Sequence, residues 1–127
     1  MARVVLDASA LLALLNDEPG ARVVEEALPE ALLSAVNLAE VASILVGGGM
    51  EESGVRNLLL DLGLTVVVFD EAAAFGTAAL RPATKALGLS LGDRACLALA
   101  RAEGVPALTA DRAWTKAEVG VKVELIR

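Results

Sequence analysis

Short apolar runs alternate along the chain with longer segments in which apolar residues recur at helical spacing. The apolar run at 4–6 is typical of a buried strand. The runs at 31–35, 64–69 and 106–109 also predict strands, and the alternating segment 121–126 is compatible with an edge strand. Helices are predicted, from apolar residues at helical spacing or from residues that start and end helices, at 8–16, 21–28, 37–46, 51–62, 71–80 and 90–103. This alternation predicts a single α/β domain over residues 1–127, with a central, mostly parallel β-sheet flanked by α-helices on both sides.

Four carboxylates lie where the predicted elements begin or end. Asp7 and Asp111 directly follow the first and fourth strands. Glu40 lies in the first turn of the helix after the second strand, and Asp93 lies in the first turn of the last long helix. The carboxyl ends of parallel strands share one edge of a sheet, where ligands bind in open α/β folds. We therefore expect the four side chains to converge at this edge.

Helix capping is the alternative interpretation of these acids. Asp7 and Asp111 occupy predicted N-cap positions, and the spacings at 37–40 and 90–93 resemble capping boxes. For each acid taken alone, capping is favoured. Four anions at one edge repel one another, however, and such a cluster is stable mainly with a cation between them. Oxygen ligands suit Mg²⁺ or Mn²⁺, which bind substrate phosphates, so the cluster indicates metal-assisted phosphodiester chemistry.

The composition narrows the chemistry further. The chain has 17 acidic and 11 basic residues, and this net charge of −6 argues against broad, charge-driven binding of nucleic acid. The absence of histidine excludes Ser-His-Asp and Cys-His catalysis and zinc sites that contain histidine. Cys96 is the only cysteine, which excludes an intrachain disulfide and indicates a reducing cytoplasm. The longest uncharged stretch, 41–50, is shorter than the roughly 20 residues that span a bilayer, so we expect no membrane association and no targeting segment.

The motifs around the acids resemble those of the PIN-domain family. They read D-A-S-A at 7–10, N-x-x-E at 37–40, L-G-D-R-A at 91–95 and L-T-A-D at 108–111. Their order covers nearly the whole chain, which most resembles the small ribonuclease toxins of the VapC type. The resemblance implies a PIN-like fold and a Mg²⁺- or Mn²⁺-dependent endoribonuclease that hydrolyses RNA phosphodiester bonds with metal-activated water. It also implies a homodimer and a cognate antitoxin protein as partner.

The resemblance also assigns roles to individual residues. The catalytic and metal-binding acids that it implies are Asp7, Glu40, Asp93 and Asp111. Ser9 and Thr109 match hydroxyl positions that support these acids or the metal-bound waters. Arg94 and Arg112 each follow a site acid, and contacts to the RNA backbone and ordinary surface ion pairs are equally open for them.

Two other function classes compete with the nuclease. In a haloacid-dehalogenase-like phosphatase, Asp7 would be the nucleophile, with Asp93 and Lys85 as later site residues. Such enzymes usually carry a second aspartate two residues on, where this chain has Ser9. In a non-enzymatic interaction module, the acids would serve only as helix caps. Saturable stabilisation by Mg²⁺ or Mn²⁺ would distinguish either enzyme from that module.

Overall fold

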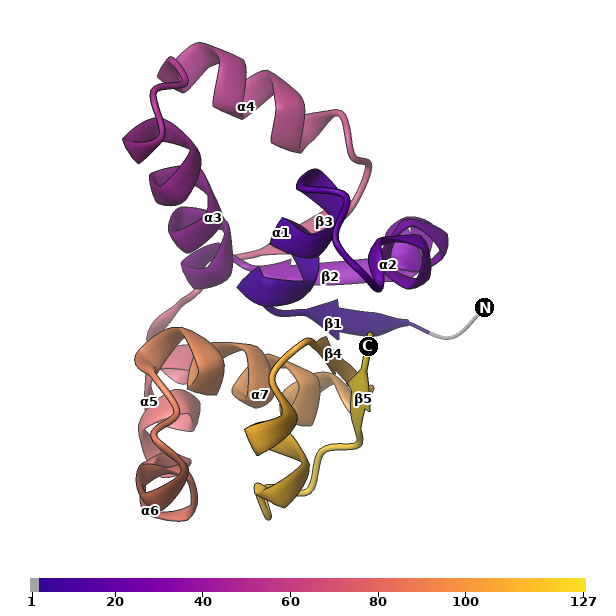
Figure 1. Cartoon of the computed structure of the whole chain (residues 1–127). Helices are drawn as coiled ribbons and strands as arrows, with labels where there is room; N and C mark the ends of the chain where they lie inside the picture. The colour runs from indigo at the N-terminus through magenta and orange to yellow at the C-terminus, as the bar shows by residue number, and fades with distance from the viewer. Residues whose placement is uncertain (1–2) are drawn as a thin grey trace.

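The structure is a computed structural model that describes residues 3–127 (Figure 1). Its five strands form one sheet in the order β3-β2-β1-β4-β5, and every neighbouring pair is parallel. The strands are β1 (Val4–Leu6), β2 (Ala31–Ser34), β3 (Thr65–Val67), β4 (Ala107–Thr109) and β5 (Val123–Leu125). The predicted parallel sheet and the edge strand near the carboxyl terminus are confirmed. The chain adds β2 and β3 on one side of β1 and then crosses to β4 on the other, so the strand order reverses between β1 and β4.

The helices cover both faces of the sheet, as the alternating pattern predicts. Figure 1 shows α1 to α4 on one side and α5 to α7 on the other. The helices on the first side are α1 (Ala8–Leu15), α2 (Ala21–Ala27), α3 (Ala35–Gly47) and α4 (Glu52–Leu60). Those on the second side are α5 (Glu71–Ala79), α6 (Arg81–Thr84) and α7 (Leu91–Glu103), and 3-10 turns lie at Leu28–Glu30, Lys85–Leu87 and Arg112–Lys116. Within residues 3–127, no helix combines the length and apolarity needed to span a membrane.

The central strand β1 is buried from both sides. Val4 and Leu6 pack in the hydrophobic cluster under α1 and α2, whereas Val5 packs with Leu97 of α7 and with Trp114. Successive side chains of a strand point to opposite faces, so a strand covered by helices on both sides is apolar at every position. This burial explains the unbroken Val-Val-Leu run and leaves Asp7 as the first polar residue after the strand.

Helix α3 starts earlier than the sequence predicts. Ser34, the last residue of β2, caps the helix by accepting a hydrogen bond from the Val36 amide at 3.2 Å. Asn37 and Glu40 therefore lie within α3, and the expectation that they form a capping box in its first turn is wrong. The physical reason is that Ser34 supplies the capping oxygen before Asn37 is reached.

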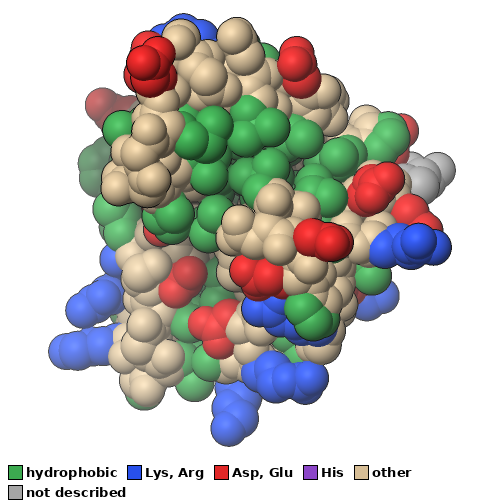
Figure 2. All heavy atoms as spheres, turned by 45° about the horizontal axis from the view of Figure 1, so that its top comes forward, with side chains coloured by type: hydrophobic (Ala, Val, Ile, Leu, Met, Phe, Trp, Pro, Cys, Tyr) green, Lys and Arg blue, Asp and Glu red, His purple; other side chains and the backbone are tan. Residues whose placement is uncertain are grey.

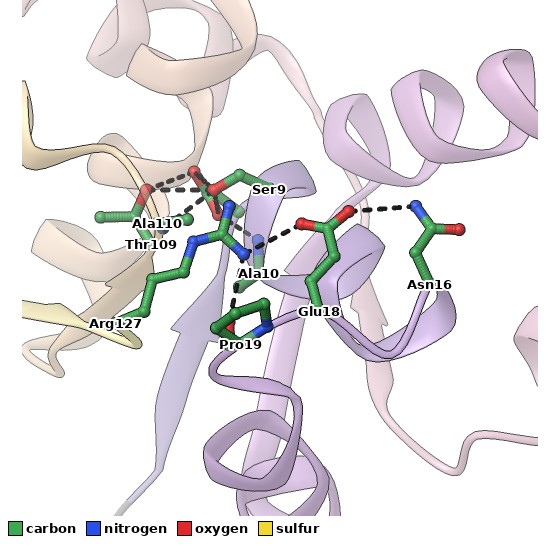
Figure 3. Close-up of polar contacts among 9 residues, drawn as sticks. Ser9, Ala10, Asn16, Glu18, Pro19, Thr109, Ala110 and Arg127 are labelled. Atoms are coloured by element: carbon green, nitrogen blue, oxygen red, sulfur yellow. Dashed lines mark hydrogen bonds and ion pairs between the residues drawn. The ribbon is translucent and has the colours of Figure 1, made fainter.

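The end of the chain packs against the turn between α1 and α2. The Ile126 amide donates to the Thr109 carbonyl at 3.0 Å. The Arg127 guanidinium donates to Glu18 Oε1 at 2.9 Å and to the Pro19 carbonyl at 3.1 Å (Figure 3). Gly20 follows with a φ of 96°, and a Cβ at this position would overlap Ile126. The turn thus needs glycine both for its backbone conformation and for this close approach.

Candidate active site at the carboxyl edge of the sheet

Asp7 is the buried centre of the candidate site. It follows β1 with an extended backbone and caps α1, because its Oδ1 accepts a hydrogen bond from the Ala10 amide at 2.8 Å. The residue is only 3% exposed. The capping interpretation of Asp7 is therefore confirmed. A cap alone does not require burial, however, since N-cap carboxylates commonly remain in contact with water.

Two hydroxyl groups fix the orientation of the Asp7 carboxylate. Thr109, the last residue of β4, donates to Asp7 Oδ2 at 2.6 Å, and the Ser9 hydroxyl lies 2.8 and 2.9 Å from the two carboxylate oxygens (Figure 3). The hydroxyls are themselves held, since Ser9 Oγ accepts from the Ala110 amide and Thr109 Oγ1 accepts from the Asp111 amide, both at 3.0 Å. This network joins β1 to β4 where the strand order reverses, the place at which open α/β sheets bind ligands.

Burial makes the charge of Asp7 costly. It raises the pKa of Asp7 from an ordinary 3.8 to about 6, and the negative charge of Asp93 contributes in the same direction. The hydrogen bonds from Thr109, Ala10 and Ser9 lower the pKa and so oppose this effect without cancelling it. A neighbouring cation would favour the charged form, because an opposite charge within a few ångströms lowers the pKa of a carboxyl group.

Glu40 and Asp93 both lie at the amino end of α7. Glu40 Oε1 accepts a hydrogen bond from Asn37 Nδ2 at 2.7 Å, and its carboxylate lies against Gly92, where a Cβ would overlap it. Asp93 forms a capping box with Ser90, accepting from the Ser90 amide at 2.8 Å while Ser90 Oγ accepts from the Asp93 amide at 3.2 Å. Capping is thus confirmed for Asp93. The carboxylate of Glu40, by contrast, caps nothing and is held by a side chain of its own helix.

The thiol of Cys96 in α7 is fully buried. Burial raises the pKa of Cys96 well above its usual value, and the charges of Asp7, Asp93 and Glu40 raise it further. Asp111 is exposed and caps the following 3-10 turn, with its Oδ1 accepting from the Ala113 amide at 2.9 Å.

Within residues 3–127, the candidate acids do not form a closed metal cage. Nowhere in this part of the chain do three or more carboxylate, thiol or imidazole groups come together closely enough to enclose an ion. Mg²⁺ does not require such a cage, because it usually keeps several waters and takes one or two carboxylates. The donors are all oxygens, the Asp7 charge is disfavoured by burial, and the buried Asn37 Oδ1 accepts no hydrogen bond within the described residues. These features fit a hydrated divalent cation.

Arg94 and Arg112 lie close to site acids in the sequence but have different surroundings. Arg94 Nη1 donates to the Thr77 carbonyl of α5 at 3.3 Å, and its buried Nε has no partner within residues 3–127. Arg112 is exposed, and its Nη2 donates to the Arg127 carbonyl at 3.1 Å. Neither arginine forms an ion pair with a carboxylate in the described chain. The sequence paired Asn37 with Glu40 only as a capping box. In the structure the pair instead forms a side-chain hydrogen bond within α3, because three-residue spacing on a helix places two side chains side by side.

Comparison with known proteins agrees with this fold. A family model described as the PIN domain matches residues 4–119. The chain belongs to the PIN-domain family. This PIN domain is 34% identical to the VapC ribonuclease Mb2780c of Mycobacterium bovis, a match that covers 83% of this chain and 88% of the relative. It has the same identity and coverage with ribonuclease VapC42 of Mycobacterium tuberculosis.

Solved structures share the fold at lower identity. A toxin–antitoxin complex from Klebsiella pneumoniae contains a chain that matches with a TM-score of 0.75 and 20% identity, covering 98% of each chain. VapC20 of Mycobacterium tuberculosis, a sarcin–ricin loop cleaving toxin, matches with a TM-score of 0.75 and 18% identity, covering 94% of this PIN domain and 98% of VapC20. These neighbours confirm the PIN-like α/β fold.

Proposed function

We propose that this PIN domain is a Mg²⁺- or Mn²⁺-dependent endoribonuclease and the toxin of a toxin–antitoxin pair. The observation that carries the proposal is the buried Asp7 carboxylate, which Ser9 and Thr109 hold in one orientation and whose pKa is raised by burial and by the charge of Asp93. The 34% identity to VapC ribonucleases supports the activity. Membership of the PIN family favours a nuclease over the phosphatase alternative.

Some residues of the site hold the cation, and others orient the carboxylates that hold it. Asp7, Glu40, Asp93 and Asp111 supply the carboxylates in this proposal. Ser9 and Thr109 keep the Asp7 carboxylate in one orientation by donating hydrogen bonds to it. When bound, the cation supplies an activated water and offsets the charge that develops on the phosphate, so no side-chain nucleophile is needed. The guanidinium groups of Arg94 and Arg112 are candidates for contacts with the RNA backbone.

An apolar groove between α3 and α4 supports an antitoxin partner. The groove has a volume of about 290 Å³ and lies between α3 and α4, lined mainly by Leu38, Ala42, Val46, Val55, Leu59 and Leu60. Figure 2 shows a continuous area of hydrophobic side chains on the face that includes the top of Figure 1. Such a groove fits the apolar face of an amphipathic helix, a common mode of peptide recognition. We assign this groove to the antitoxin.

A second apolar surface supports the proposed homodimer. Val68 after β3 and Phe75 of α5 are 75% and 70% exposed. Val68 also lines a cavity of about 310 Å³ between α5 and α7. Large apolar side chains grouped at a surface are typical of protein interfaces. Size-exclusion chromatography with light scattering tests the dimer, and Phe75→Lys should shift it to monomer.

The protein acts in the reducing cytoplasm in this proposal, as its single cysteine suggests.

The test of the activity is cleavage of RNA by the purified protein. Total cellular RNA is incubated with the wild-type protein in Mn²⁺ or in EDTA, and with the variant Asp7→Asn in Mn²⁺. The ends of the RNA fragments are then mapped by sequencing. Exposed Asp61→Asn is the matched control. We expect cutting that requires metal, is lost in Asp7→Asn and is retained in Asp61→Asn. Equal cutting in EDTA and by Asp7→Asn refutes the metal mechanism, and metal-dependent release of phosphate from p-nitrophenyl phosphate without RNA cutting supports the phosphatase instead.

A further inference from the structure

Asn37 connects the two helices that carry Glu40 and Asp93. It lies in α3 and is only 1% exposed. Its Nδ2 donates to Glu40 Oε1 at 2.7 Å and to the carbonyl oxygen of Gly92, in the first turn of α7, at 3.0 Å. Both partners are acceptors, so the orientation of the Asn37 amide is determined: the nitrogen faces the acid and the oxygen faces away.

Gly92 leaves the space in which the Glu40 carboxylate lies. A Cβ at residue 92 would overlap the carboxylate, whereas the glycine allows it to rest against the backbone of α7. Glu40 is therefore held between the Asn37 amide and this backbone. The next residue of α7 is Asp93, so the same contact brings two acids to one end of the helix.

The hydrogen bond to Gly92 gives the Asn37 nitrogen a structural role, but it does not explain the oxygen of the same amide. Its Oδ1 is buried and accepts no hydrogen bond from the described residues. Burial of an unpaired polar atom costs free energy, and an apolar side chain of similar shape avoids that cost. The favourable contacts of this amide are all made by the nitrogen that holds Glu40 and α7.

We propose that Asn37 is a positioning residue of the metal site, whose amide keeps Glu40 against Gly92 so that Glu40 and Asp93 act on the same cation. This inference rests on the metal-dependent function proposed above and adds to it the residue that sets the geometry of Glu40. Asn37 does not itself contact the reacting atoms. It acts through Glu40, and Gly92 makes room for that carboxylate.

The test measures Mn²⁺ affinity of the full chain by isothermal titration calorimetry, with urea unfolding in EDTA as a separate readout of the fold. Asn37→Leu keeps the branching at Cγ and the number of side-chain heavy atoms, and it removes the donor and the acceptor of the amide. We expect it to weaken Mn²⁺ binding by about 10–100-fold, the usual effect of losing a partner that orients a metal ligand. The control is Thr84→Val in α6, which removes another buried hydrogen bond, from Thr84 Oγ1 to the Leu80 carbonyl at 2.8 Å, and should leave Mn²⁺ affinity unchanged.

A double-mutant cycle separates positioning from general damage. If Asn37 acts through Glu40, then Asn37→Leu combined with Glu40→Gln binds Mn²⁺ no more weakly than Glu40→Gln alone. Gly92→Ala displaces Glu40 without altering Asn37 and should weaken binding to a similar extent, which keeps the test decisive if Asn37→Leu does not fold.

The outcomes distinguish this inference from the proposed function. The role of Asn37 is overturned if folded Asn37→Leu binds Mn²⁺ with wild-type affinity, or if the losses of affinity in the double variant are fully additive. Neither result contradicts the proposed nuclease function. If Asn37→Leu does not fold, unchanged Mn²⁺ affinity in Gly92→Ala overturns the role of Asn37. Wild-type protein that binds no Mn²⁺ overturns both.

Discussion

Replacing Asp7 with asparagine should stabilise the protein when no metal is present. Asp7 is buried, and its burial raises the pKa of the carboxyl from 3.8 to about 6. A side chain of nearly the same size without the negative charge avoids the cost of burying that charge. The same change removes a metal ligand in the proposed site, so stability and metal response should move in opposite directions.

The magnitude and its pH dependence follow from the pKa of Asp7. Because the pKa is raised in the folded state, the folded protein binds the proton more tightly than the unfolded chain does. The cost of the charge is therefore absent below pH 3.8, grows as the pH rises towards 6 and is complete at pH 7, where it reaches about 3 kcal/mol. Asparagine Nδ2 cannot accept the hydrogen bond from Thr109, which removes about 1 kcal/mol of the gain.

The expected net effect is a gain of about 2 kcal/mol in the free energy of unfolding at pH 7 in EDTA, which corresponds to a rise in Tm of roughly 6–10 °C. The gain should shrink to near zero at pH 4. Urea unfolding from pH 4 to pH 8 measures both, with Trp114, the only tryptophan, as the buried fluorescent probe. With Mn²⁺ in excess, the wild-type protein should gain stability by mass action and Asp7→Asn should not.

Two results would refute this reasoning. If Asp7→Asn is less stable than wild type at pH 7 in EDTA, the hydrogen bonds of the carboxylate outweigh the cost of its burial. If the difference between the proteins does not change with pH, the titration of Asp7 does not cause it. Asp61→Asn, at an exposed position, is the control and should change stability by no more than about 0.5 kcal/mol at any of these pH values.

Three further substitutions test other parts of the structure. Thr109→Val removes the hydrogen bond that lowers the pKa of Asp7, so that pKa should rise further and Mn²⁺ affinity measured by calorimetry at pH 6 should fall. Gly20→Ala should destabilise the fold by more than about 1 kcal/mol in urea, since alanine is strained at a φ of 96° and its Cβ would overlap Ile126. Trp114→Ala should cost about 3–5 kcal/mol, followed by circular dichroism, because the indole is completely buried.

Much of the fold could be predicted from local patterns in the sequence. The run 4–6 is apolar at every position because β1 is covered on both faces, and this pattern alone indicates a buried parallel strand. Asp7, Ser90 and Asp111 were predictable as caps, since a short polar side chain before a helix satisfies its free amides. The start of α3 was predicted wrongly because two capping residues, Ser34 and Asn37, compete within one short segment.

For the candidate site, too, some features follow from the local sequence and others from long-range packing. The sequence by itself determined which residue types end the strands, and so placed Asp7 and Asp111 at the carboxyl edge of the sheet. Only the tertiary structure decided that Ser9 and Thr109, 100 residues apart, orient the same carboxylate, because this depends on β4 pairing with β1. It also decided that Asn37 holds Glu40 against α7. Such contacts arise from the packing of whole elements, which local periodicity and propensity do not encode.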